Sequence, residues 1–344
     1  MLFGHLKRGK IENKNIAVKP GVWLLIIVFM LTACSREAKD SRKDKFETAK
    51  ANGIEFLDSI KVYINPITMN KDSKMNYKKH LVEYISTYLT FYETSHSTKE
   101  KTLYKRKVEE VIAPVYTSEY HNFANSSLEE FKDNVVSYLN AGRILQKLGF
   151  DTKMYKEKIG EILPLIISKE HQNARKLTNN MAIRLHLDEL GFKGGYSYME
   201  LYQNPECIVR THPNIEGLNM YSLTHEIFYL TNYGTTGVKC ATSSDLSYLK
   251  EIFLKLVPKG IEMNNPDLVA ELLVCLHYIG LKNTKQYNEA IDYLLSCQNL
   301  DGSWGNYEKL KKEVENFNPA YIVEASQYLH TTHVALWALS LAFD

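Results

Sequence analysis

The sequence predicts an all-α protein built from helical hairpins, and three observations support this fold class. Apolar residues recur with helical periodicity almost continuously from residue 46 onward. No stretch alternates apolar and polar residues for long enough to suggest a sheet. The pattern T-K-x-Y-x3-I-x2-(I/L)-L occurs at residues 152–163 and again at 284–295, 132 positions later (284 − 152). That interval has room for three two-helix repeats of about 44 residues each.

The predicted helices follow one another with short connections. In chain order they are Lys45–Tyr63, Asn76–Tyr92, Thr98–Ile112, Ser127–Leu148, Lys153–Ile167, Gln172–Leu190, Met220–Tyr233, Ser244–Leu256, Pro266–Ile279, Lys285–Cys297 and Pro319–Leu341. Two of the predicted helices have capping signals at their N-termini. Ser127 precedes acidic residues, and Asn265 precedes a proline at the first helical position. Three ends, at 148–150, 190–192 and 279–281, place a glycine before a hydrophobic residue, as C-terminal caps do.

The composition is that of a globular protein, and its charge balance does not indicate a nucleic-acid partner. The chain has 344 residues, of which 44% are hydrophobic and 24% charged, and this length allows one large or two ordinary domains. Lys plus Arg number 42 against 40 acidic residues, so the net charge of +2 argues against a nucleic-acid partner. The 23 tyrosines suit helix interfaces and also sugar-binding surfaces. No phosphate-binding glycine loop or nucleophile elbow is present.

The N-terminus predicts export and a lipid anchor. Basic residues precede the apolar run 23–31, and its nine residues are too few to span a bilayer. The run ends in Leu-Thr-Ala-Cys at 31–34, which resembles the lipobox of bacterial lipoproteins. This resemblance implies that residues 1–33 form a signal peptide and that lipidated Cys34 joins the protein to a membrane of the bacterial cell envelope. With Ser35 following, it implies the outer membrane if the source is Gram-negative.

The rest of the chain divides into a short charged segment and one domain. Residues 34–45 read as a flexible tether, and residues 46–344 as the helical-hairpin domain. The domain has four cysteines, and exported proteins can form disulfides. Their spacing selects none of the three possible pairings among Cys207, Cys240, Cys275 and Cys297.

Two C-terminal segments carry a family resemblance. Residues 298–305, Gln-Asn-Leu-Asp-Gly-Ser-Trp-Gly, resemble the QW turn of terpenoid cyclases and their relatives. Residues 328–340 resemble an inner-helix segment of protein prenyltransferase β subunits, in which a histidine near the helix start binds zinc. The resemblance implies an α/α toroid, partial or complete, in which one ring of helices lies inside another around a cavity.

Two departures from those enzymes weigh against prenyl or terpenoid chemistry. Ser303 stands where the prenyltransferases have a thiolate, and no acid-rich DxDD segment occurs. Residues 219–234 also resemble uncharacterised bacterial proteins with a YxLTH…FYLT(D/N)xG stretch and a later HTT…LWAL segment, which imply no known activity.

Four residues are the candidate catalytic set: His225, Glu226, Glu271 and His330. His225 and Glu226 lie on an otherwise apolar helix, where ionisable groups need a partner or a cavity. Asp267 and Glu271 are four residues apart on one helix face, and glycoside hydrolysis requires such paired carboxylates. In the simpler alternatives, His225 is a hydrogen-bonded core histidine and Asp267 only complements the helix dipole.

A metal is a separate hypothesis. His330 and His333 are three residues apart and share a helix face, so they could bind zinc together. His225, His277 and Asp301 are candidates for the remaining ligands, and the alternative is that the two histidines cap a helix or face solvent. No HExxH or clustered Cys/His signature supports the zinc hypothesis.

The expected binding residues are Arg210, His212, Tyr229 and Trp304. Arg210 and His212 belong to a predicted loop, 203–217, where an arginine could bind an anionic group. Together these features predict a membrane-anchored extracytoplasmic protein that processes or binds a saccharide or peptide in its cavity. The alternative is a non-catalytic surface module that binds a glycan, a peptide or a partner protein.

Overall fold

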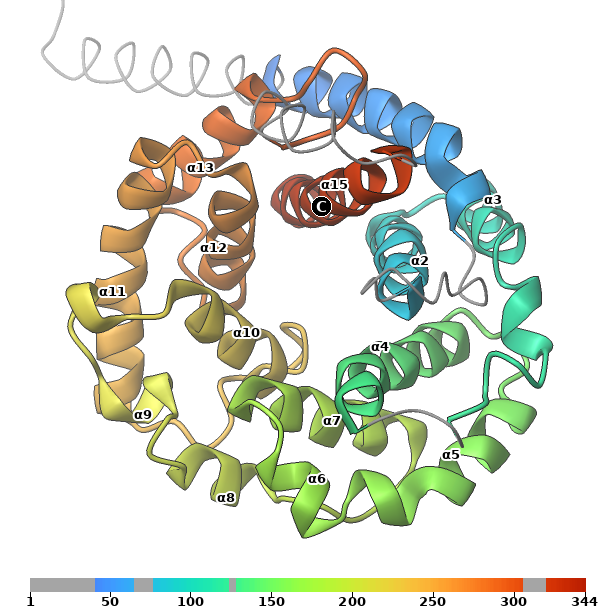
Figure 1. Ribbon diagram of the computed structural model, residues 1–344. Coiled ribbons are helices and arrows are strands. Elements are labelled where there is room, and N and C mark those ends of the chain that lie inside the picture. Colours follow the sequence, from blue (N-terminus) through green and yellow to red (C-terminus); the bar gives the residue numbers. More distant parts are fainter. Residues whose placement is uncertain (1–40, 65–76, 124–127, 306–319) are drawn as a thin grey trace, which may run out of the picture. The chain divides into compact units, whose positions relative to one another are not determined.

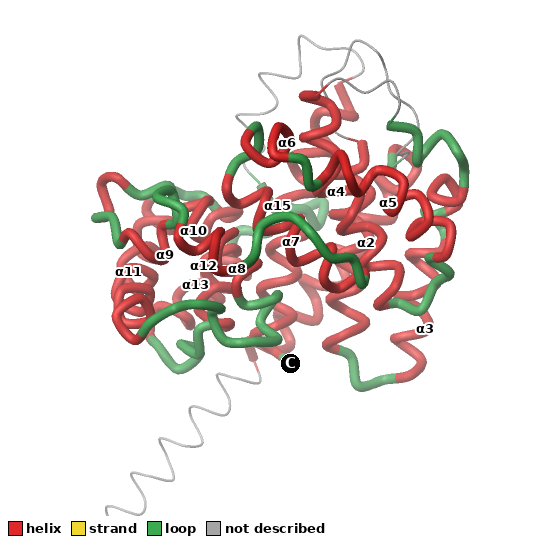
Figure 2. The backbone as a smooth tube through the Cα atoms, turned by 90° about the horizontal axis from the view of Figure 1, so that it is seen from below, coloured by secondary structure: helices red, strands yellow, loops and turns green. Residues whose placement is uncertain are grey.

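The protein is helical throughout the part of the chain that its structure describes. The computed structural model describes residues 41–64, 77–123, 128–305 and 320–344. Every regular element in these ranges is an α-helix or a 3-10 helix and none is a strand (Figure 2), which confirms the predicted all-α class. The chain from Phe46 to Asp344 forms one compact unit. The predicted signal peptide and Cys34 lie outside the described residues.

The first helix covers residues 41–60. The later elements are η1 (Lys61–Tyr63), α2 (Tyr77–Thr94), α3 (Thr98–Glu109), η2 (Ala113–Tyr116), α4 (Leu128–Lys147), α5 (Lys153–Ile166), α6 (Lys169–Asn173), α7 (Leu177–Leu190), α8 (Tyr198–Gln203), α9 (Ile208–Thr211), η3 (Ile215–Gly217), α10 (Met220–Leu230), α11 (Ser243–Glu262), α12 (Pro266–Tyr278), α13 (Lys285–Ser296) and α15 (Ala320–Phe343).

Within residues 46–344, six helices contact one another in a closed cycle. Helix α2 packs on α4, α4 on α7, α7 on α10, α10 on α12 and α12 on α15, and α15 returns to α2 (Figure 1). Other helices pack outside them: α3 on α2, α5 on α4, α8 on α7, α9 on α10, and α11 and α13 on α12. We call the first six the inner helices.

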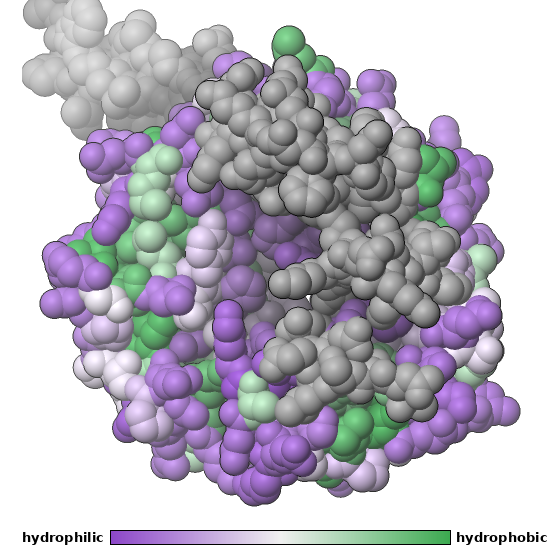
Figure 3. Space-filling model, viewed as in Figure 1, coloured by the Kyte–Doolittle hydropathy of each residue, from purple (hydrophilic) through white to green (hydrophobic). Residues whose placement is uncertain are grey.

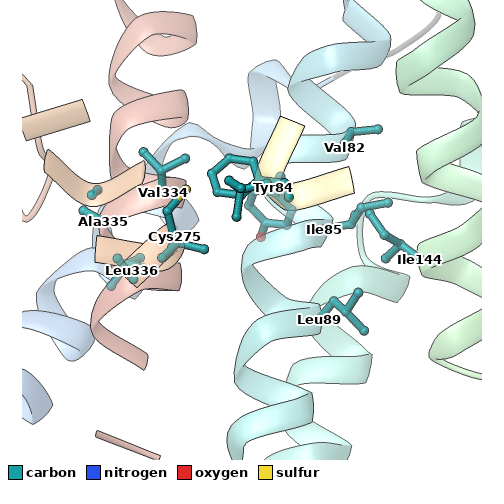
Figure 4. Close-up of a cluster of buried hydrophobic side chains, with 14 of the residues drawn as sticks. Val82, Tyr84, Ile85, Leu89, Ile144, Cys275, Val334, Ala335 and Leu336 are labelled. Carbon is teal, nitrogen blue, oxygen red and sulfur yellow. The ribbon is translucent and has the colours of Figure 1, made fainter. Parts of the chain in front are cut away.

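The inner helices are buried on most of their surface because they have neighbours on nearly every side. Every residue from 268 to 276 of α12 is buried, which is typical of a helix inside a core. Side chains of α2, α4, α12 and α15 meet in this core (Figure 4). In this stretch of α12, Glu271 alone carries a charged side chain, although only 1% of its surface is exposed.

The turn 298–305 joins the last hairpin to the first helix. Gln298 Nε2 donates hydrogen bonds to the carbonyl oxygens of Ala49, at 2.8 Å, and Gly302, at 2.9 Å. The Trp304 ring is fully buried, and its Nε1 donates to the Leu294 carbonyl oxygen at 2.8 Å. Gly302 has a φ of +86°, which is costly for other residues. Residues that resemble a QW turn therefore connect opposite ends of the chain.

Several element boundaries differ from the predicted ones. The first helix begins at residue 41, so residues 41–45, the end of the predicted tether, are helical. Helix α11 continues through Pro258 to Glu262 instead of ending at 256. Val257 and Gly260 of this extension are buried, and Gly260 lies close to Val269 of α12. Packing here outweighs the low helix propensity of proline.

Two predicted segments are subdivided. The predicted loop 203–217 contains α9 and η3. The predicted helix 172–190 is split after α6, where Arg175 donates from Nη1 to the Ile166 carbonyl oxygen at 2.8 Å and so satisfies the end of α5. The cysteines of the domain, Cys207, Cys240, Cys275 and Cys297, are all free thiols.

Candidate functional site

Ionisable side chains from four inner helices meet inside the cycle. We call Glu83 of α2, His225 of α10, Asp267 and Glu271 of α12, and His330 of α15 the polar cluster. His330 Nδ1 lies 2.8 Å from Glu83 Oε1, and His330 Nε2 lies 3.3 Å from Asp267 Oδ1. His225 Nδ1 lies 3.9 Å from Glu271 Oε2. Donor atoms of Asp267, Glu271 and His330 all lie within 4.8 Å of one another.

Glu83 and His330 form the most strongly coupled pair of the cluster. Burial is the largest single effect on both groups and opposes their ionisation, but the surrounding charges and hydrogen bonds together outweigh it. The charge of His330, assisted by Lys79, lowers the pKa of Glu83 to about 2. The charge and hydrogen bond of Glu83, together with Asp267, raise the pKa of His330 to about 9. Glu83 therefore fixes the orientation of the imidazole ring through Nδ1 and directs Nε2 toward Asp267.

Glu271 is buried more completely than Glu83, with 1% of its side chain exposed against 6% for Glu83. Burial raises its pKa, Asp267 adds to this effect, and the charges of His225 and His330 oppose it. The hydroxyl of Thr224 donates a hydrogen bond to Glu271 Oε2. His225 Nδ1 lies 2.6 Å from the Tyr221 carbonyl oxygen, so Nδ1 carries the proton and Nε2 is the basic nitrogen.

A second polar site lies one turn further along the inner helices. His333 Nδ1 is 3.0 Å from Thr87 Oγ1, and its ring stacks on Trp337 with centroids 6.0 Å apart. Burial lowers the pKa of His333 to about 4, so the ring is neutral near pH 7. His333 therefore does not join His330 at one site.

A cavity of about 200 Å³ lies next to His333. Its lining, which we call the aromatic pocket, includes Arg143, Tyr233, Tyr278, His333 and Trp337. Arg143 pairs with Glu189 at 3.2 Å and stacks over the Tyr233 ring at 4.4 Å.

The polar cluster and the aromatic pocket occupy opposite halves of the inner helices. On α2, Glu83 precedes the pocket residues 86–94, and on α15 His330 precedes His333 and Trp337. On α12, the cluster uses residues 267 and 271, whereas the pocket uses Tyr278. These helices therefore run in the same direction, with their N-terminal halves beside the cluster. Figure 3 shows a hollow near the middle of one face, and the coloured residues beside it are mainly hydrophilic.

Glu226 faces away from its neighbour His225. Its carboxylate accepts hydrogen bonds from the backbone N–H groups of Ile208 and Val209, each at 3.0 Å, and lies 3.5 Å from Cys207 Sγ. Glu226 thereby satisfies the first N–H groups of α9. Burial raises its pKa to about 7, although these backbone hydrogen bonds favour the carboxylate.

The expected binding residues do not meet at one site. Arg210 is exposed on α9, and His212 Nε2 lies 2.7 Å from Asp245 Oδ1 on the outer helix α11. Trp304 is a buried part of the turn. Tyr229 lies between His225 and Tyr233, with ring centroids 6.0 Å from each.

The additional candidate zinc ligands also lie apart from the polar cluster. His277 Nδ1 is 3.0 Å from the Tyr287 hydroxyl, and burial lowers the pKa of His277 to about 4. Asp301 Oδ1 accepts hydrogen bonds from the backbone and hydroxyl of Ser303 in the turn.

Sequence reasoning missed two participants, Glu83 and Tyr221. Glu83 lies between apolar residues in Leu-Val-Glu-Tyr-Ile, and a single acid in such a run was the available signal. The hydroxyl of Tyr221 lies beside Asp267, and burial followed by the charge of Asp267 raises the pKa of Tyr221. Nothing in the sequence distinguishes Tyr221 from the other tyrosines.

Comparison with known proteins gives one match. The model of a domain family, described as Domain of unknown function (DUF6895), matches residues 84–340. No curated protein and no solved structure matches the sequence. None of the described helices is both long enough and apolar enough to cross a bilayer.

Proposed function

The chain belongs to the DUF6895 family, whose function is unknown, and we propose that it is a lipid-anchored envelope hydrolase with the polar cluster as its catalytic centre. The convergence of Asp267, Glu271, His225 and His330 from three inner helices carries this proposal. Buried ionisable groups are costly, and they concentrate where a protein binds or transforms a ligand. We further propose that the closed cycle of inner helices is an α/α toroid.

The cluster contains the groups that hydrolysis requires. Asp267 and Glu271 supply two carboxyl groups, and His225 presents a basic Nε2 on a half-exposed ring beside Glu271. One group can activate water while another donates a proton to the leaving group. A saccharide or peptide is the proposed substrate class, because both are cleaved by a pair of oriented acid and base groups.

Peptidoglycan fragments provide a probe that contains both kinds of bond. We expect wild-type protein to release new reducing ends or new amino groups from them. We expect Asp267→Asn and Glu271→Gln to slow this release at least about a hundredfold, since loss of an acid or base typically costs that factor. Glu251→Gln on the exposed face of α11 serves as the control, because Glu251 forms a surface ion pair with Lys255, away from the polar cluster.

Two results would contradict the proposal. One is unchanged turnover in folded Asp267→Asn and Glu271→Gln variants. The other is the release of neither group by the wild type, which would rule out this substrate class.

The aromatic pocket supports the second candidate function, a non-catalytic binding module. It combines aromatic rings with hydroxyl groups, and Arg143 and Lys147 are paired with acids, which suits an uncharged, polar ligand. Trp337 lines the pocket whereas Trp304 is fully buried, so ligand binding should change the fluorescence of Trp337. Fluorescence changes without turnover, absent in Trp337→Phe, would favour this alternative.

The proposed anchor is tested at Cys34. We expect Cys34→Ser to abolish incorporation of a labelled fatty acid and to move the protein from the membrane fraction to the soluble fraction, because the anchor supplies the membrane affinity. Cys240→Ser is the matched control, since Cys240 is a partly exposed free thiol of the domain. Retention of label in the Cys34 variant would show that the lipid is attached elsewhere.

A further inference from the structure

Three donor side chains of the polar cluster face a common point. Asp267 and Glu271 reach it from successive turns of α12, and His330 reaches it from α15, with donor atoms within 4.8 Å of one another. In the described part of the chain, Asp267 Oδ1 is buried and accepts no hydrogen bond, although His330 Nε2 lies 3.3 Å away. A buried carboxylate oxygen without a hydrogen bond is costly unless a ligand satisfies it.

We propose that Asp267, Glu271 and His330 bind one divalent transition-metal ion, with zinc as the best fit. The sequence predicted His330 and His333 as zinc ligands. The structure instead groups His330 with Asp267 and Glu271, which the sequence analysis did not combine in one metal site. The inference rests on the proposed function and changes how the shared residues would act in it. With the ion bound, Asp267 and Glu271 would be ligands, the ion would supply an activated water, and His225 would remain as the acid or base.

A neighbouring side chain, which we call an outer partner, contacts each of the three proposed ligands and orients it. Glu83 lies 2.8 Å from His330 Nδ1, which leaves Nε2 available to a metal. The Thr224 hydroxyl donates to Glu271, and the Tyr221 hydroxyl lies beside Asp267. Histidine ligands usually donate their second nitrogen to a carboxylate, and such partners are typical of built metal sites.

The ligand set indicates the class of metal. One imidazole nitrogen and two carboxylate oxygens suit zinc and its neighbours among the transition metals. Calcium prefers six to eight oxygen ligands, and magnesium rarely binds imidazole. Three protein ligands leave a coordination position for water, as in catalytic zinc sites.

A metal ion at this point would replace the contact between His330 Nε2 and Asp267 Oδ1, which are 3.3 Å apart. The contact of Glu83 with Nδ1 would remain, so the imidazole ring need not turn to bind the ion.

The test is zinc titration of the full-length protein, purified in detergent and stripped with a chelator. We expect one zinc ion per chain, measured by isothermal titration calorimetry. Affinity should fall at least about tenfold in Asp267→Asn and in Glu271→Gln, and about 10- to 100-fold in Glu83→Gln, which removes an outer partner. His333→Gln should bind zinc like the wild type, and calcium should not bind.

A second readout separates binding from activity. Cobalt(II) in this site should give the visible absorption of a four-coordinate ion, and zinc should abolish it. Absence of zinc binding, or equal binding by the wild type and the Asp267 and Glu271 variants, would overturn the site. Because the titration uses the metal alone, its failure is distinct from a failure to cleave peptidoglycan fragments.

Discussion

Gly302→Ala is expected to lower the free energy of unfolding by about 3 kcal/mol or more. A Cβ atom at Gly302 would overlap the Asn52 carbonyl oxygen, so either the turn or the first helix must move. The φ of +86° adds a cost of about 1–2 kcal/mol for an L-residue. The movement would also disturb the hydrogen bond from Gln298 to Ala49. Urea denaturation followed by circular dichroism measures the change.

Gly280→Ala is the matched control for this experiment. Gly280 has a similar φ of +80°, but its Cβ position has open space around it. The Gly280→Ala variant should therefore lose only the backbone contribution, about 1–2 kcal/mol. Equal losses in the two variants would mean that the contact between turn and first helix adds nothing to stability.

Glu226 is expected to make stability depend on pH between about 4.5 and 7. The pKa of Glu226 is raised to about 7 from an ordinary value of 4.5, so the folded protein binds more protons than the unfolded chain in this window. The free energy of unfolding therefore falls as pH rises. The shift corresponds to about 3 kcal/mol in total.

The Glu226→Gln variant isolates this contribution. Through the lost acceptor, the substitution should lower the free energy of unfolding by a constant amount at every pH. The reason is that glutamine has one acceptor oxygen, whereas the carboxylate has two for the N–H groups of Ile208 and Val209. The difference between wild type and variant should nevertheless change by about 3 kcal/mol between pH 4.5 and pH 8, in favour of the variant at high pH. Parallel pH curves would show that Glu226 titrates normally in the folded protein.

The sequence predicted the helical class because every local signal agreed with it. The predicted helix ends were wrong where contacts with other helices determine the end. Helix α11, for example, continues through Pro258 beside α12. The split after α6 depends on a contact from Arg175 to the carbonyl oxygen of Ile166, which no periodicity reveals.

The candidate site was predicted in part, and helix geometry explains the rest. His225, Glu271 and His330 lie in one cluster, but Glu226 cannot join His225 because adjacent helical residues point in different directions. His333 lies about 4.5 Å further along the axis than His330, enough to place it beside the aromatic pocket. Glu83 pairs with a residue 247 positions away, beyond the reach of any local pattern.

The hydrogen bond from Gln298 to Ala49 also constrains the order in which the molecule can assemble. The two residues are 249 positions apart, so the first helix lacks this partner until nearly the whole polypeptide has been made. An open solenoid can lose a terminal repeat and keep the others, because each unit depends only on its neighbours. In this protein α2 packs against α15. Deleting either of these helices therefore exposes apolar surface on the other, although they lie near opposite ends of the chain.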